Sequence, residues 1–194
     1  MLIMEIKMNN KNLKIGQIIN FGNYAGEKIE WEVLEINDEN VVLVSKKILD
    51  TMIFDNAVSK WENSKICLWL NNEFYNEAFN KEERRQMIPY IDENEYNKTQ
   101  KKVFLLSKDE VLRYYKTEKE RVKYSTNYAK KRGLITESGN KNNKQIYNDS
   151  ACWWTRTENE EYIIFGIGSR GLLNLNYIEM KGLGVVPTIK LRIN

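Results

Sequence analysis

The chain of 194 residues contains no histidine. Histidine is the commonest general base at neutral pH and the commonest side-chain ligand for metal ions. Its absence excludes the Ser-His-Asp and Cys-His arrangements, in which an imidazole carries the proton. We therefore expect no catalytic residues of these types, no metal site and no cofactor.

Cysteines and nucleotide-binding motifs are scarce as well. Cys67 and Cys152 lie far apart without CxxC spacing, and we expect both to be buried as small hydrophobic side chains. The chain has no GxxxxGKS or GxxxxGKT sequence. The glycine-rich stretch 166–171 precedes the strand-like pair Leu172-Leu173 rather than a helix, so it predicts a turn and not a phosphate-binding loop.

A surplus of one charge sign is also missing. The net charge is +3, from 30 basic and 27 acidic residues, and nucleic-acid binding needs a concentrated basic patch rather than a small surplus. The basic stretch 116–132 is interrupted by Glu118 and Glu120, which favours a solvated helical face. We expect no nucleic-acid partner.

Long apolar runs are absent too. The first residues lack the pattern of a secretory signal, and no run approaches the ~20 apolar residues that span a bilayer. The expectation is a cytoplasmic protein with reduced thiols and no membrane partner.

The chain is rich in apolar and aromatic residues, at 42% hydrophobic and 11% aromatic, with 5 tryptophans. That content and length predict one hydrophobic core. We expect a single domain over 1–194, with an ordered core over about 13–193 and a surface loop over 139–150, where large apolar side chains are rare. The oligomeric state is left open.

Strand patterns occupy both ends of the chain. Residues 15–21, 29–36 and 41–44, separated by turn residues, predict an antiparallel meander. Four further strand-like runs follow after residue 150, at 151–157, 162–166, 172–175 and 185–193.

Helical patterns lie between these strands. Ser64 is a plausible N-cap for a helix whose apolar positions recur every three or four residues and face the sheet: Ile66, Trp69, Leu70, Phe74 and Ala78. A short helix over 81–88 is stopped by Pro89 and followed by a loop over 92–102. Ser125 is a plausible cap for another helical turn that ends near Gly133.

A further strand and helix follow one another directly. Val103 to Leu106 is a short apolar strand, and Ser107 with Glu110 forms a capping box that opens a helix to about Tyr115. With strands at the ends and helices in the middle, the chain is predicted to be α+β, with a mainly antiparallel sheet built from both termini.

Carboxylate side chains remain possible acids or bases. We interpret each of them as solvated or as a helix cap rather than as catalytic. They are Asp50, Glu62, Asp109 and Glu110.

The most unusual patch is Trp153-Trp154-Thr155-Arg156. Neighbouring residues on a strand point to opposite faces, so one tryptophan is expected to be buried and the other more exposed. An exposed tryptophan beside Arg156 suits stacking on a sugar, a peptide side chain or a base; packing under the loop 139–150 is the favoured alternative. The candidate ligand-binding residues are Trp153, Trp154, Arg156, Arg170 and Trp61.

Several segments together resemble a family of uncharacterised bacterial domains. They run in family order and span about 21–191: Trp61-x-x-Ser64-x-Ile66-x-x-Trp69-Leu70-Asn71-x-x-Phe74, Val103-Phe104-Leu105-Leu106-Ser107-x-x-Glu110-Val111, Trp153-Trp154-x-Arg156 and Gly184-Val185-x-Pro187. Cys67 and Val186 depart from the pattern, because the family often has arginine at both positions. If those arginines serve a ligand, its binding is altered or lost in this chain.

The family is distantly similar to C-type-lectin-like folds, which include formylglycine-generating sulfatase-modifying domains and phage receptor-binding proteins. The resemblance implies a compact α+β domain with paired ends, but no activity. The formylglycine-generating reaction needs a converging cysteine pair, which does not map onto Cys67 and Cys152.

The leading hypothesis is a non-enzymatic binding module for a protein or glycan. An enzyme related to the sulfatase-modifying domains and a phage- or mobile-element-associated structural protein are the alternatives.

Overall fold

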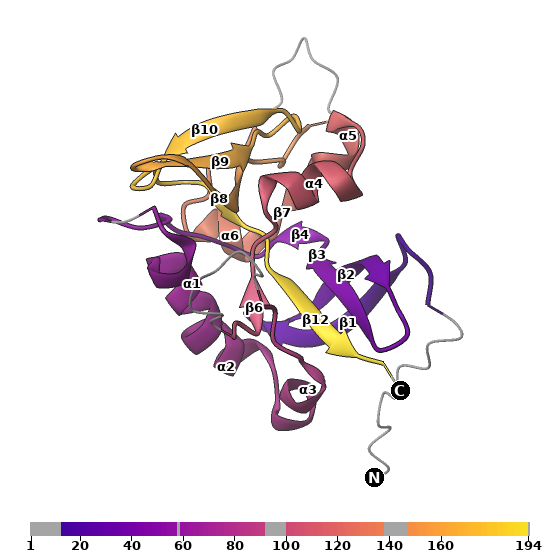
Figure 1. Cartoon of the computed structure of the whole chain (residues 1–194). Helices are drawn as coiled ribbons and strands as arrows, with labels where there is room; N and C mark the ends of the chain where they lie inside the picture. Colours follow the sequence, from indigo (N-terminus) through magenta and orange to yellow (C-terminus); the bar gives the residue numbers. More distant parts are fainter. Residues whose placement is uncertain (1–12, 58, 92–99, 138–146, 194) are drawn as a thin grey trace.

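A computed structural model describes residues 13–57, 59–91, 100–137 and 147–193 (Figure 1). The N-terminal strand patterns form three consecutive antiparallel strands, joined by short turns. They are β1 (Ile18–Tyr24), β2 (Glu27–Ile36) and β3 (Asn40–Ser45). The predicted meander is therefore confirmed. Ala25 and Gly26 both have positive φ in the β1–β2 turn, as tight hairpins require.

The first sheet also takes in the end of the chain. β12 (Thr188–Arg192) pairs antiparallel with β3 on one side and with β6 (Val103–Phe104) on the other, which gives the order β1-β2-β3-β12-β6. The last strand thus lies inside a sheet begun by the first, and the predicted pairing of the two ends is confirmed.

The remaining C-terminal runs form a second sheet of order β10-β9-β8-β11-β5. Its members are β8 (Trp153–Glu160), β9 (Ile163–Ile167), β10 (Leu173–Tyr177), β11 (Gly184–Val185) and β5 (Asp50–Thr51). β11 pairs parallel with β8, and the other pairs are antiparallel. The glycine-rich stretch begins in the last two residues of β9 and then turns toward β10, as predicted.

A short strand pair stands apart from the two sheets, and the path of the chain links the sheets to each other. β4 (Lys47–Ile48) pairs parallel with β7 (Tyr124–Ser125). The chain passes directly from β11 in the second sheet to β12 in the first across Val186 and Pro187. The antiparallel sheet predicted from both termini is therefore divided into two.

The first helical segment follows its predicted pattern. Ser64 accepts the Cys67 N–H as N-cap, and the chain stays helical from α1 (Lys65–Trp69) through a π-helical turn (Leu70–Phe74) to α2 (Tyr75–Ala78). Of the predicted apolar stripe, Trp69 is only half-buried and the others are buried.

The other helices are short. They are a 3-10 turn (Trp61–Asn63), α3 (Lys81–Gln86), α4 (Lys108–Tyr114), α5 (Glu118–Arg121) and α6 (Asn127–Lys131). The Ser107–Glu110 capping box opens α4 as predicted. Thr126, not Ser125, caps α6, because its hydroxyl accepts the Ala129 N–H three residues ahead.

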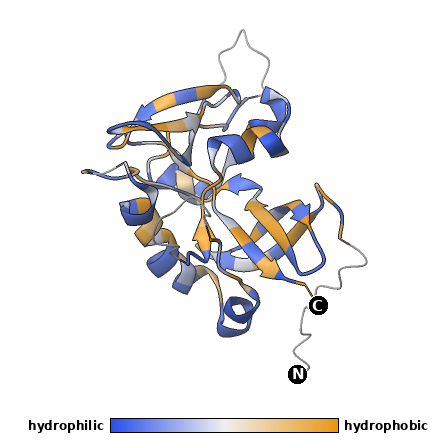
Figure 2. Ribbon diagram, viewed as in Figure 1, coloured by the Kyte–Doolittle hydropathy of each residue, from blue (hydrophilic) through white to orange (hydrophobic). Residues whose placement is uncertain are grey.

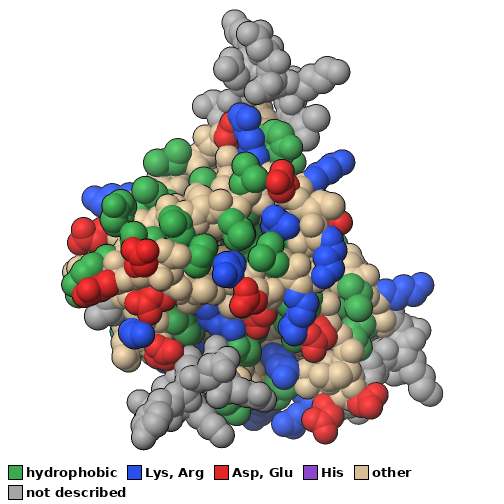
Figure 3. Space-filling model, turned by 45° about the horizontal axis from the view of Figure 1, so that its top comes forward, with side chains coloured by type: hydrophobic (Ala, Val, Ile, Leu, Met, Phe, Trp, Pro, Cys, Tyr) green, Lys and Arg blue, Asp and Glu red, His purple; other side chains and the backbone are tan. Residues whose placement is uncertain are grey.

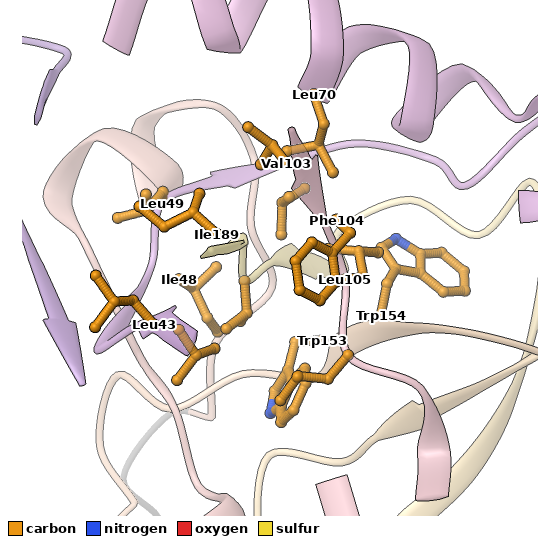
Figure 4. Close-up of a cluster of buried hydrophobic side chains, with 14 of the residues drawn as sticks. Leu43, Ile48, Leu49, Leu70, Val103, Phe104, Leu105, Trp153, Trp154 and Ile189 are labelled. Carbon is orange, nitrogen blue, oxygen red and sulfur yellow. The ribbon is translucent and has the colours of Figure 1, made fainter. Parts of the chain in front are cut away.

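The buried apolar side chains of both sheets and of the helices form one continuous core. Figure 4 shows part of it, where Leu43 and Ile189 of the first sheet, Ile48 of β4 and the two tryptophans of β8 lie close together. The described residues form a single compact α+β domain with antiparallel sheets, as predicted. The predicted loop 139–150 lies mostly outside the described residues, and so does most of the predicted loop 92–102.

Within the described residues, no helix combines the length and the apolar character that crossing a bilayer requires.

Candidate interaction surface

Trp153 and Trp154 are both fully buried, so the expectation that one would be exposed is wrong. They do point to opposite sides, as Figure 4 shows. The Trp153 indole N–H donates to the Arg121 carbonyl of α5, while that of Trp154 donates to the Met52 carbonyl. Because other segments cover both faces of the sheet here, neither ring offers a surface for stacking.

Arg156 is buried among its own partners. Its guanidinium donates to the Leu105 carbonyl, to the Tyr90 hydroxyl and to both carboxylate oxygens of Glu110. It also lies 4.7 Å from the centre of the Tyr90 ring, which stacks on Phe104. These contacts hold β8 against the start of α4, so Arg156 binds groups of its own chain.

The other two candidates lie apart from this pair. Trp61 is buried against Phe54, and within the described residues its indole N–H has no hydrogen-bond partner. Arg170 is half-exposed and forms an ion pair of 2.6 Å with Glu137. The five predicted residues are therefore not brought together into one accessible site.

Two of the four carboxylates, Asp50 and Glu110, have structural partners. Asp50 is buried, not solvated: it accepts the Tyr24 hydroxyl at 2.6 Å and pairs with Arg132 at 3.3 Å. Burial and the hydrogen bond to Asp50 raise the pKa of Tyr24. Glu110 completes its capping box and also binds Arg156, Asp109 is exposed, and Glu62 is half-buried.

The basic stretch 116–132 is only partly a solvated face. Lys123 is buried, with its ammonium 3.2 Å from the Glu32 carboxylate and 3.1 Å from the Tyr115 hydroxyl. Burial lowers the pKa of Lys123, and the Glu32 carboxylate opposes that shift. The interpretation as a solvated face is wrong at this position, because a tertiary contact with β2 gives the lysine its partner.

Neither cysteine is in a disulfide: Cys67 is buried as expected, whereas Cys152 is only half-buried. Among the described residues, no group of three or more cysteine, aspartate or glutamate side chains is placed to hold a metal ion.

One open groove of about 510 Å³ lies between β1 and the end of α2. Its polar lining includes Asn20, Asn23, Asn76, Asn80 and Arg84. The Arg84 guanidinium is engaged by the Asn76 side chain and the Phe79 carbonyl. The aromatic rings of this groove, Phe21 and Phe79, are buried, so they offer no stacking platform.

The clearest exposed apolar surface lies on the second sheet, over β9 and β10. Leu173, Leu175 and Tyr177 alternate with two asparagines along β10 and are 38%, 52% and 65% exposed. Figure 2 shows this alternation, and Figure 3 shows hydrophobic side chains gathered over this part of the molecule, next to acidic ones.

The neighbouring strand extends the same surface. Phe165 and Ile163 of β9 lie directly opposite Leu175 and Tyr177 and are half-buried. We call these five side chains the β10 face: Ile163, Phe165, Leu173, Leu175 and Tyr177.

The helix α4 covers only part of this side of the sheet. The Lys108 ammonium at its start lies 4.6 Å from the centre of the Phe165 ring. Further along the same side, Ile167 and Trp153 are paired and fully buried, and the Trp153 indole reaches α5. The β10 face is the part that α4 and α5 leave uncovered.

Sequence reasoning predicted a strand over 172–175 but not this surface. The alternation of leucine and asparagine indicates one apolar face, and such a face ordinarily packs against the core. The run from Leu172 to Ile178 lacks charge, but so does the buried run 41–44, so the sequence holds no signal that separates this face from a core-facing one.

A family model described as a domain of unknown function (DUF6273) matches residues 38–193. No curated protein and no solved structure matches the chain.

Proposed function

Because the chain belongs to this family of domains of unknown function, whose description names no activity, we propose a function from the geometry alone. The chain is a non-enzymatic interaction module that binds a protein partner through the β10 face. The observation that carries the proposal is the row of three exposed apolar side chains on β10, continued by two on β9.

Apolar side chains in contact with one another on a surface favour association. Removing such area from water contributes roughly 25 cal/mol per Å², and contiguous apolar patches on otherwise polar surfaces mark interaction sites. Leu175 and Tyr177 are more than half exposed in the chain alone. A partner that covers them gains this free energy without first unfolding any part of the domain.

A protein fits this surface better than a glycan does. Sugars need many hydrogen-bonding groups beside a stacking ring, whereas the β10 face presents leucine, isoleucine and phenylalanine and only one hydroxyl, that of Tyr177. The asparagine side chains of β10 point to the other side of the sheet, where Asn174 and Asn176 bond to each other.

We also propose that the domain is C-type-lectin-like. A C-type-lectin-like arrangement is supported by β12 lying beside β3, because the resemblance implies paired ends. The two alternatives are an enzyme related to sulfatase-modifying domains and a phage- or mobile-element-associated structural protein, and no contact within the described residues favours either.

The test places a photo-crosslinking phenylalanine analogue at Tyr177 in cells that normally make the protein. Tyr124 is the matched control, because it is also a tyrosine, is 41% exposed and lies on β7. We expect adducts with one defined protein from position 177 and none from position 124.

Binding of the identified partner is then measured with purified proteins. We expect Leu175→Lys to weaken the dissociation constant at least tenfold, because it places a charge in the contact, whereas Leu68→Lys on α1, with similar exposure, leaves it unchanged. A partner that binds Leu175→Lys as well as the natural chain would refute the proposal.

A further inference from the structure

The outer edge of β10 has backbone groups that the sheet leaves unpaired. β10 is the last strand of its sheet. Only alternate residues hydrogen-bond to β9: the Gly168 N–H donates to the Leu172 carbonyl, and the Ile178 N–H donates to the Tyr162 carbonyl. The even-numbered residues therefore face β9. The N–H groups of Leu173, Leu175 and Tyr177 therefore point away from β9, together with the carbonyls of the two leucines.

The Tyr177 carbonyl points the same way but already accepts the Met180 N–H in the following turn. No strand within the described part of the chain pairs with this side of β10. The edge thus offers a template about five residues long for a further strand.

The other edge strands of the two five-stranded sheets, β1, β6 and β5, have features that hinder the pairing of a further strand, and β10 lacks them. Edge strands are usually short, charged, interrupted by a bulge or covered. β5 and β6 have two residues each, and β1 has an irregular register between Asn20 and Asn23 and packs against α2. β10 reads Leu-Asn-Leu-Asn-Tyr, without charge, proline or bulge.

The strand is complementary to itself. If two copies pair antiparallel about Leu175, each Leu173 lies opposite the other copy's Tyr177, and the outward backbone groups of the leucines meet. The two-fold axis then stands perpendicular to the sheet. Both β10 faces end up on the same side, so their apolar side chains form one continuous surface.

Charge at the ends of the strand favours the antiparallel direction. Arg170, whose guanidinium pairs with Glu137 of its own chain, precedes β10, and Glu179 follows it; both side chains are exposed. Antiparallel pairing brings Arg170 of each copy toward Glu179 of the other, whereas parallel pairing sets like charges side by side. Such rim charges contribute little affinity but select orientation.

We propose that β10 pairs antiparallel with β10 of a second copy of this chain, centred on Leu175, to give a closed dimer with a continuous sheet. This inference rests on the proposed function and names its partner. Each chain has one such β10 edge, so the assembly ends at two copies.

The first test measures mass in solution by size-exclusion chromatography with light scattering. We expect the mass of two chains for the natural protein and of one chain for Leu175→Lys, because the symmetric pair sets two ammonium groups directly opposite each other. Leu68→Lys is the control and should remain a dimer. Far-ultraviolet circular dichroism checks that both variants are folded.

The second test reads the register by disulfide formation. Leu175→Cys places two sulfurs at directly opposite positions, whose Cα atoms are about 5.5 Å apart in a hydrogen-bonded pair and within disulfide range. Leu173→Cys is the matched control, because its two copies lie four residues apart along the strand. We expect a covalent dimer from Leu175→Cys only, with the natural chain, which keeps Cys67 and Cys152, treated in the same way.

Two results would overturn the inference. One is a natural chain with the mass of a single copy at every concentration; the other is equal crosslinking at 173 and 175. If the chain is monomeric but Tyr177 still crosslinks to a different protein, the partner named here is wrong while the proposed function stands. If neither a second copy nor another protein is captured, both fail.

Discussion

At the residue scale, the same side-chain types that suggest ligand binding serve the interior of this protein. Arginine beside tryptophan is a common recognition pattern, yet Arg156 binds Glu110 and lies over the Tyr90 ring within its own chain. Lys123 and Asp50 are likewise buried beside opposite charges. A buried charge needs such a partner, because isolating it from water costs several kcal/mol.

Replacing Arg156 should therefore reduce the stability of the fold rather than the binding of a ligand. We expect Arg156→Met to lower the free energy of unfolding by about 3–5 kcal/mol, because it removes the hydrogen bonds that Arg156 donates to Glu110, to Tyr90 and to the Leu105 carbonyl in the interior. Urea denaturation measures the change.

Arg113→Met is the matched control for this substitution. Arg113 also pairs with a glutamate, Glu35, but its side chain is 60% exposed, and we expect a loss under about 1 kcal/mol. Equal small losses for Arg113→Met and Arg156→Met would mean that the Arg156 guanidinium is not a structural group.

At the element scale, local chemistry decides where helices begin and turns bend. The predicted capping box at Ser107 is present, and Thr117 and Asn80 form two more. A cap is readable because its partners lie three residues apart in sequence. The contacts between elements are not readable in this way, as Gly22 illustrates.

Gly22 on β1 has φ +74°, and a Cβ there would lie 2.7 Å from the Ala78 carbonyl oxygen and the Phe79 ring. Gly26 has φ +82°, but a Cβ at this position would meet no atom within 4 Å. We expect Gly26→Ala to cost about 1–2 kcal/mol of unfolding free energy from backbone strain alone. Gly22→Ala should cost about 1–3 kcal/mol more, from the clash with α2. Thermal or urea unfolding compares the two, and equal losses would contradict the close approach of β1 and α2.

At the scale of the whole molecule, β12 links the N-terminal and the C-terminal groups of strands, which are far apart in the sequence. It follows β11 of the second sheet and lies between β3 and β6 of the first. The core side chains of both sheets form one cluster. A single domain over 1–194 is the corresponding prediction, and it implies that the two sheets unfold together.

Ile189→Ala tests that cooperativity. Ile189 is fully buried on β12, and we expect the substitution to cost about 2–5 kcal/mol. Tryptophans lie in both sheets, Trp31 on β2 and Trp153 and Trp154 on β8. Fluorescence and far-ultraviolet circular dichroism should therefore shift to the same lower midpoint. Two separate transitions would contradict the single-domain prediction.

The sequence by itself determined the features that depend on near neighbours along the chain. The meander, the Ser107 cap, the C-terminal strands and the α+β class follow from periodicity, turn residues and caps, because strand and helix geometry repeat over two to four residues. The role of Glu110 as a capping residue is readable from the sequence for the same reason.

Only the tertiary structure decided which side chains are exposed. Trp153 and Trp154 are both buried because α5 covers one side of β8 and the chain around Met52, which follows β5, covers the other. Leu175 is exposed because no described element packs on that part of the sheet. Burial is set by segments far away in the sequence, so the same alternating strand pattern serves a core in one place and an open surface in another.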